Sequence, residues 1–167
     1  MEDLPRLIVQ YLHVLAGVMW VGAGFYTILV QTPALMAAPP PARGAVLATL
    51  APRQIFYLLR IGELTIVTGF LRIVVSGRAR EMSDLGSRWS VSILVGLVLA
   101  VVLLGLAHGV LKPGIRRLLS LGPQAAQGDQ AAAGEAARLI ARFRTIGYVQ
   151  LALGLVIVGT MALARLS

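Results

Sequence analysis

The feature that most constrains this chain is residues 7–30, an apolar run without a formal charge. A helix needs roughly 20 mostly apolar residues to cross a bilayer, so this run is long enough to span one. Three further apolar runs follow, at residues 54–76, 90–111 and 146–164. With 57% hydrophobic residues and a mean hydropathy of +0.82, a soluble domain of this length would expose too much apolar surface. We expect one all-α domain, residues 1–167, that forms a four-helix transmembrane bundle.

The basic residues indicate a membrane partner and not a nucleic acid. The net charge is +8, but the arginines mostly flank the spans, where they hold loops in place and meet anionic lipid head groups. No basic face remains for a nucleic acid once the spans are assigned. The arginine count places the loops after the first and third spans in the cytoplasm and both termini outside. We therefore expect a protein of the bacterial inner membrane.

The segments between the spans have their own patterns. Residues 42–51 are expected to form a short surface helix, and the Gly- and Ala-rich residues 122–134 a mobile loop. Residues 135–144 alternate apolar and basic positions as an amphipathic helix on the membrane surface does. We find no internal repeat. The chain has no Cys, which excludes disulfides, thiolate metal sites and a Cys nucleophile.

One stripe of the first span joins a titratable ring to small residues. Steps of three and four residues return to the same helix face, and here they connect His13, Gly17, Trp20, Gly24, Thr27 and Gln31. A His within a membrane helix is a functional hypothesis by default and should face the protein interior. The alternatives are structural: the ring can be satisfied by a backbone carbonyl or a hydroxyl, and the glycines can serve close helix packing.

The two histidines of the chain invite a bis-imidazole haem site, which counting along the helices argues against. Measured from the membrane face at which both termini are expected, His13 lies about 9 Å deep and His108 about 27 Å deep. About 18 Å of depth therefore separates the two residues. Met161 lies near the depth of His13, so these two residues are candidates to ligate a haem iron from both sides. His108 remains a second candidate metal ligand. Met161 as core filler is the structural alternative.

The second span is unusual because charged residues interrupt its apolar run. Arg60 and Glu63 are one helical turn apart, so they can pair and lower each other's cost in lipid, while Arg72 lies near the end of the span. These side chains predict either an interfacial ion pair or the lining of a cavity. We take Arg60 and Glu63 as candidates for binding a substrate or relaying a proton.

The first span also resembles a known family. Tyr11-Leu12-His13, then Trp20, then Gly24-Phe25-Tyr26 resemble the first span of the HemJ-type protoporphyrinogen oxidases and of the related CopD-like copper-resistance domains. The resemblance implies a small helical membrane protein that binds haem b through His13, with a Met as second ligand, and acts as an oxidoreductase on a porphyrinogen or a quinone.

Three functions follow as hypotheses. The first is a haem-b membrane protein with redox activity, for which a quinone or another membrane protein exchanges electrons and Gly17, Trp20 and Gly24 line the cofactor. The second is a CopD-like copper transport or resistance protein, although Cu(I) prefers soft ligands and the five Met residues are scattered. The third is a non-catalytic membrane anchor or assembly subunit. A homo-oligomer is compatible with each.

Overall fold

A computed structural model describes residues 3–166, with the side chains of residues 4–39 and 42–166, and it is helical almost throughout. The first half contains α1 (Asp3–Tyr26), η1 (Thr27–Gln31), α2 (Thr32–Ala37) and α3 (Pro40–Val75). A six-residue 3₁₀ segment, η2 (Arg78–Ser83), leads to the second half. That half contains α4 (Arg88–Leu106), η3 (Ala107–Leu111), α5 (Lys112–Ala126) and α6 (Gln130–Arg165). The expected all-α class is confirmed.

Three helical stretches are long and apolar enough to cross a membrane: Leu4–Ala37, Arg88–Ala126 and Gln130–Arg165. They contain the first, third and fourth predicted spans. The second predicted span, residues 54–76, lies in α3, which is not among the three. α3 differs from them because Arg60, Glu63 and Arg72 interrupt its apolar run.

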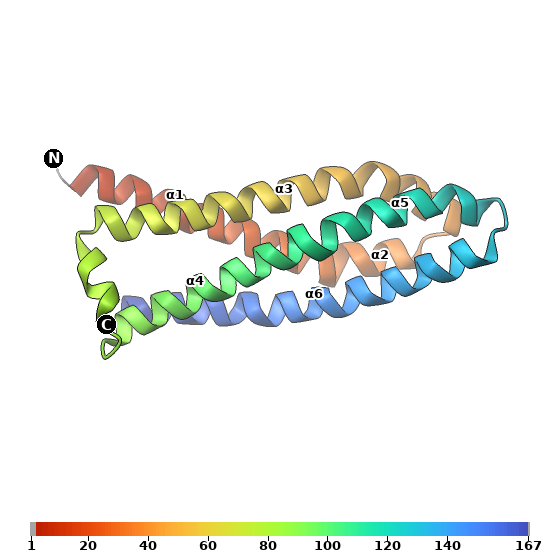
Figure 1. Cartoon of the computed structure of the whole chain (residues 1–167). Coiled ribbons are helices and arrows are strands. Elements are labelled where there is room, and N and C mark those ends of the chain that lie inside the picture. The colour runs from red at the N-terminus through yellow and green to blue at the C-terminus, as the bar shows by residue number, and fades with distance from the viewer. Residues whose placement is uncertain (1–2, 167) are drawn as a thin grey trace.

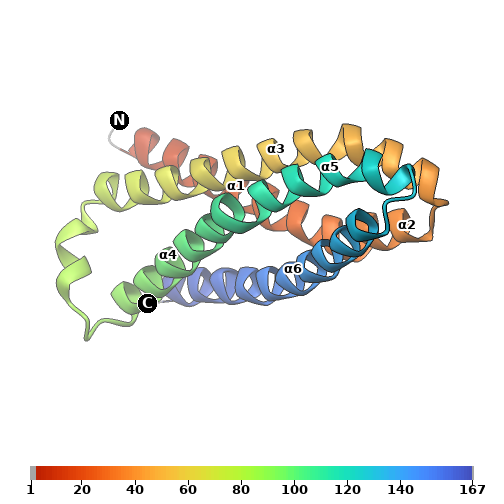
Figure 2. The same cartoon turned by 45° about the vertical axis from the view of Figure 1, so that its right-hand side comes forward.

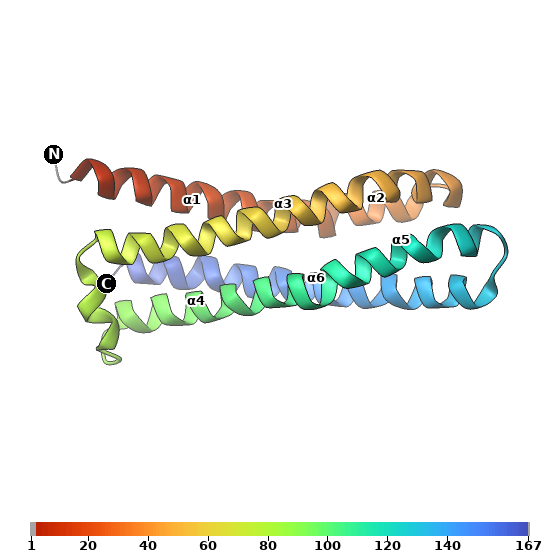
Figure 3. The same ribbon diagram turned by 45° about the horizontal axis from the view of Figure 1, so that its top comes forward.

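The helices run as two antiparallel pairs (Figure 1). α1 packs along α3, and α4 with α5 packs along α6. Figure 3 shows the two pairs one above the other, and fewer contacts join the pairs than join the helices within each pair. Both described termini and η2 lie at one end of the molecule, and the α2–α3 and α5–α6 connections lie at the other (Figures 1 and 2).

Each half contains a wide helical turn followed by a proline. η1 and η3 are π-helical, and the N–H groups of Thr32 and Lys112 donate to carbonyls five residues back, on Thr27 and Ala107. The next residue in each case is a proline, which has no N–H to donate and therefore disturbs the α-helical ladder. The two halves therefore have the same order of helical elements, although their amino-acid sequences show no repeat.

The connecting segments are more helical than expected. Residues 42–51 form the beginning of α3, which continues through Pro52. Residues 135–144 belong to the continuous α6, with exposed arginines and half-buried apolar side chains as the amphipathic pattern indicates. Most of residues 122–134 is helical too, because α5 extends to Ala126 and the Asp129 carboxylate caps α6 by accepting the N–H groups of Ala131 and Ala132.

The buried residues lie mainly along the helix contacts of the second half. Trp89, Ile93 and Ala164 form one cluster at the terminal end, with Ile73, Met82 and Met161 packed against it. Many large apolar side chains elsewhere are exposed, among them Val18, Phe56, Phe70 and Val98. A soluble monomer rarely exposes so much contiguous apolar surface.

Candidate functional site

The His13 ring crosses from α1 to the backbone of α3. Its Nδ1 lies 3.0 Å from the carbonyl oxygen of Thr65. A carbonyl can only accept, so Nδ1 carries the hydrogen. The Thr68 hydroxyl lies 3.4 Å from the same nitrogen, but it donates to the carbonyls of Leu64 and Thr65, at 2.7 and 3.1 Å. In the neutral ring Nε2 therefore keeps its lone pair.

Glycines on α3 make room for the large side chains of α1. A Cβ atom at Gly69 would lie 2.8 Å from Cε1 of His13, and one at Gly62 would lie 2.8 Å from Cε2 of Trp20. Between them, a Cβ at Gly17 would meet the Thr65 methyl group at an ordinary 3.8 Å. The predicted stripe of α1 thus faces α3 at these positions, and Gly17 serves close packing.

Sequence reasoning identified the stripe on α1 but did not identify the surface that receives it. The signal was available, because Gly62 and Gly69 have the same seven-residue spacing as Trp20 and His13 on the antiparallel partner. Gly24 does not take part in this way, since a Cβ there would meet nothing within 4 Å. The Thr65 carbonyl belongs to the backbone, so the sequence carried no signal for it.

An amide network closes the far end of the α1–α3 contact. The Gln54 amide donates to Thr27 Oγ1 at 2.6 Å and to Gln31 Oε1 at 3.0 Å, and Gln31 donates back to Gln54 Oε1 at 2.8 Å. Thr27 and Gln31 are the first and last residues of η1. The polar seam, which we define as His13, Thr27, Gln31, Gln54, Thr65 and Thr68, therefore runs from mid-α1 to its π turn.

The structure does not present Met161 to His13. Its terminal methyl group packs into the space above Gly96 of α4, beside the cluster of Trp89, Ile93 and Ala164. Counting residues placed Met161 and His13 at a similar depth, but depth leaves open which way a side chain faces around its helix. The arrangement matches the core-filling alternative for Met161.

A second polar group joins α3 to η3. Glu63 accepts from Arg60 through Oε2 and lies 3.1 Å from Nε2 of His108 through Oε1, while the Arg60–Glu63 distance is also 3.1 Å. The Arg60 guanidinium also lies 5.4 Å from the centre of the Phe56 ring. Exposed fractions of 68% for Arg60, 34% for Glu63 and 41% for His108 place this triad at the protein surface. The predicted Arg60–Glu63 pair forms, and His108 extends it.

The two histidines reach the same stretch of α3 from different sides. Their partners, Thr65 and Glu63, are two residues apart, so about 3 Å of helix axis separates these positions and they face about 160° apart. The predicted depth difference of about 18 Å assumed upright helices. α4 and α5 instead run obliquely toward α3 (Figures 1 and 2). The conclusion that the two histidines do not share one iron still follows, because they engage different faces.

Within residues 3–166, no group of three or more His, Asp or Glu side chains is arranged to hold a metal ion. A comparison with models of protein families, with curated proteins and with solved structures finds no match for this chain.

Proposed function

We propose that this chain is a polytopic membrane protein whose four long helical segments form a transmembrane bundle. Its support is the three apolar stretches together with the exposed Val, Leu and Phe side chains around the molecule. α3 becomes compatible with the bilayer because α1 covers its polar seam and Glu63 pairs its charge with Arg60. The proposed location is the bacterial inner membrane, with the termini outside.

Single-cysteine variants test this topology cleanly, because the natural chain has no Cys. A membrane-impermeant thiol reagent should label a cysteine at position 84 from one side of intact vesicles and cysteines at positions 38 and 128 from the other side, because α3 lies between 38 and 84. Labelling of positions 38 and 84 from the same side would contradict a crossing by α3 and therefore four spans. Extraction of the protein by carbonate alone would contradict membrane integration.

We further propose that the protein binds haem b through Nε2 of His13 and acts in electron transfer, as the HemJ-like resemblance implies. The observation that carries this proposal is that the bond from Nδ1 to the Thr65 carbonyl, which is also what the structural alternative expects, leaves Nε2 with its lone pair. Histidines that bind metals almost always donate their other N–H to a carbonyl or carboxylate, which fixes the ring and its tautomer. His13 supplies one nitrogen donor of the kind that a haem iron takes, and Met161, which faces α4, does not supply the opposite ligand.

The chain's own residues have distinct roles in this proposal. Thr65 fixes the orientation of the His13 ring, and Gly69 leaves the space in which the ring lies. The Trp20 side chain packs against Gly62 about two helical turns farther along α1 and so holds α1 on α3. When bound, haem supplies one-electron chemistry at its iron. Glu63, held by Arg60 and His108, is the group that takes up or releases a proton, and Arg60 offers a cation to an acidic substrate.

An absorption spectrum of the protein purified in detergent from haem-replete cells tests the cofactor. We expect a Soret band that His13→Ala abolishes. His108→Ala is the matched control, because it removes the other imidazole from a face that the seam does not use. Absence of the band from the natural protein, or its persistence in His13→Ala, would overturn the proposal. Stoichiometric copper without a Soret band would favour the copper alternative instead.

A further inference from the structure

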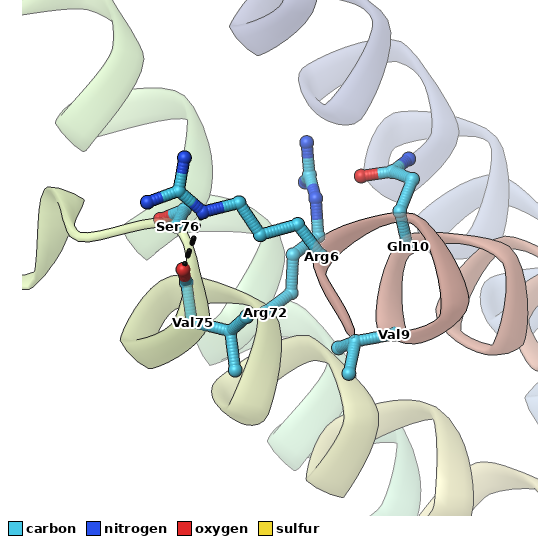
Figure 4. Close-up of a pocket in the computed structure, with 6 residues that line it drawn as sticks. All are labelled: Arg6, Val9, Gln10, Arg72, Val75 and Ser76. Atoms are coloured by element: carbon cyan, nitrogen blue, oxygen red, sulfur yellow. Dashed lines mark hydrogen bonds between the residues drawn. The ribbon is translucent and has the colours of Figure 1, made fainter. Parts of the chain in front are cut away.

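A hollow of about 250 Å³ lies between the beginning of α1 and the end of α3. Its lining is Arg6, Val9, Gln10, Arg72, Val75 and Ser76 (Figure 4). Arg6 reaches across to α3, where its Nε donates to the carbonyl of Val75 at 3.0 Å. In Figure 4 the side chain of Arg72 rises between those of Arg6 and Gln10. Two guanidinium groups and an amide thus meet at one hollow.

These two cations lack an acidic partner among the described side chains. Neither Arg6 nor Arg72 belongs to an ion pair within residues 4–39 and 42–166. Arg72 also feels the repulsion of Arg165 and Arg78, which lie at the same end of the molecule. Like charges gathered in this way favour a bound anion, and guanidinium groups suit phosphate because they present several donors in one plane.

A second hollow, which is shallow, largely apolar and formed by α1 alone, adjoins the first. It is lined by Leu4, Arg6, Leu7 and Gln10, so Arg6 and Gln10 line both. The side chains of Leu4 and Leu7 are exposed along it. Leu7 begins the apolar run of α1, which puts this hollow at the level where a bilayer changes from head groups to acyl chains. The combined surface has a charged part and an apolar part next to each other.

We propose that this surface is a binding site for one anionic phospholipid, with the phosphate between Arg6 and Arg72 and an acyl chain that runs from Leu7 past Tyr11 along the exposed face of α1, toward the bilayer centre. Basic pockets between membrane helices bind anionic head groups by the same chemistry. The proposal rests on the membrane placement proposed above and is independent of haem.

Native mass spectrometry in detergent tests the site with three probes: phosphatidylglycerol, phosphatidylcholine and inorganic phosphate. We expect the protein to retain phosphatidylglycerol, and Arg6→Gln/Arg72→Gln to lower that affinity roughly thirtyfold. The matched control Arg80→Gln/Arg88→Gln removes the same charge from exposed positions at the same end and should change the affinity less than about twofold.

Three results would overturn the proposal. An equal loss in the control would show that overall charge attracts the lipid. Equal retention of phosphatidylcholine would remove the role of the anionic head group, and competition by inorganic phosphate at matched concentration would show an anion site without a lipid.

If the double Gln variant does not fold, Arg6→Lys/Arg72→Lys keeps both charges but loses the planar fork, and it should bind more weakly than the natural protein. Unchanged binding by that variant would contradict guanidinium recognition.

Discussion

The two halves of this protein follow one backbone plan and differ in what they place between the helices. In the first half the contact between α1 and α3 is polar, with His13 above Gly69 and the amides of Gln31 and Gln54 at the far end. In the second half the corresponding contact is apolar, with Met161 above Gly96 and Phe143 above Gly114. Both halves seat a large side chain over a glycine.

In both halves a glycine of one helix makes room for a large side chain of the opposite helix. The chemistry of that side chain decides what the contact can do. An imidazole above glycine offers a lone pair at a fixed place, once a backbone carbonyl holds its other nitrogen. A thioether or a benzyl group in the same kind of seat only fills space. The first half therefore contains the candidate site, and the second half supplies support together with His108.

Replacing Gly69 and Gly96 by alanine should give the largest difference in stability between the two halves. Gly69→Ala places a Cβ against the rigid His13 ring, so the ring or a helix must shift, at a cost of about 1–3 kcal/mol. Gly96→Ala meets the end of the flexible Met161 side chain and places its Cβ 3.0 Å from Thr160 Oγ1, so we expect a smaller loss, of about 1 kcal/mol. Unfolding in mixed micelles measures both.

The same pair of variants sharpens the functional comparison. Gly69→Ala should also diminish the Soret band, because the ring loses its fixed position, whereas Gly96→Ala should leave the band intact. A larger destabilisation by Gly96→Ala would show that the apolar seat is the more rigid one, contrary to the comparison.

Sequence reasoning succeeded where the interaction is local. The Arg60–Glu63 pair follows from one helical turn, and the orientation of Trp20 with His13 follows from helical periodicity. It failed for Met161, because counting residues gives height along a helix but not the direction around a bundle. It also missed the repeat, since the two π turns share backbone geometry and a following proline but not their side chains.

A second, smaller difference between the two halves comes from the side-chain amide hydrogen bonds at η1. Gln54→Leu removes three hydrogen bonds around the first π turn, and we expect a loss of about 1 kcal/mol, since such bonds in membranes are individually weak. Amide hydrogen exchange at residues 27–31 should then rise, because this turn loses its side-chain link to α3.

Gln150→Leu is the matched control for that variant, because Gln150 lies in α6 and its side chain makes no hydrogen bond within residues 3–166. It should leave exchange at residues 27–31 unchanged. Equal effects of the two variants would mean that the amides of the polar seam add no specific support to the π turn.

The smallest effect concerns the outer end of the second half, where Arg117 of α5 donates to both carboxylate oxygens of Glu135 at 2.8 and 2.7 Å. This hydrogen bonding holds the pKa of Glu135 below its ordinary value of 4.5. The folded state thus binds this proton less readily than the unfolded state, so the stabilisation is fully present above pH 4.5 and is lost as the pH falls through the lowered pKa.

Glu135→Gln should remove this part of the pH dependence of unfolding, whereas Asp129→Asn, which keeps the cap of α6, should retain it. Both groups are exposed, so the change should be slight and should shrink further in high salt. A pH dependence that survives in Glu135→Gln would assign it to a different carboxylate and would leave the α5–α6 end held by apolar packing, such as Phe143 against Gly114, as the rest of that half is.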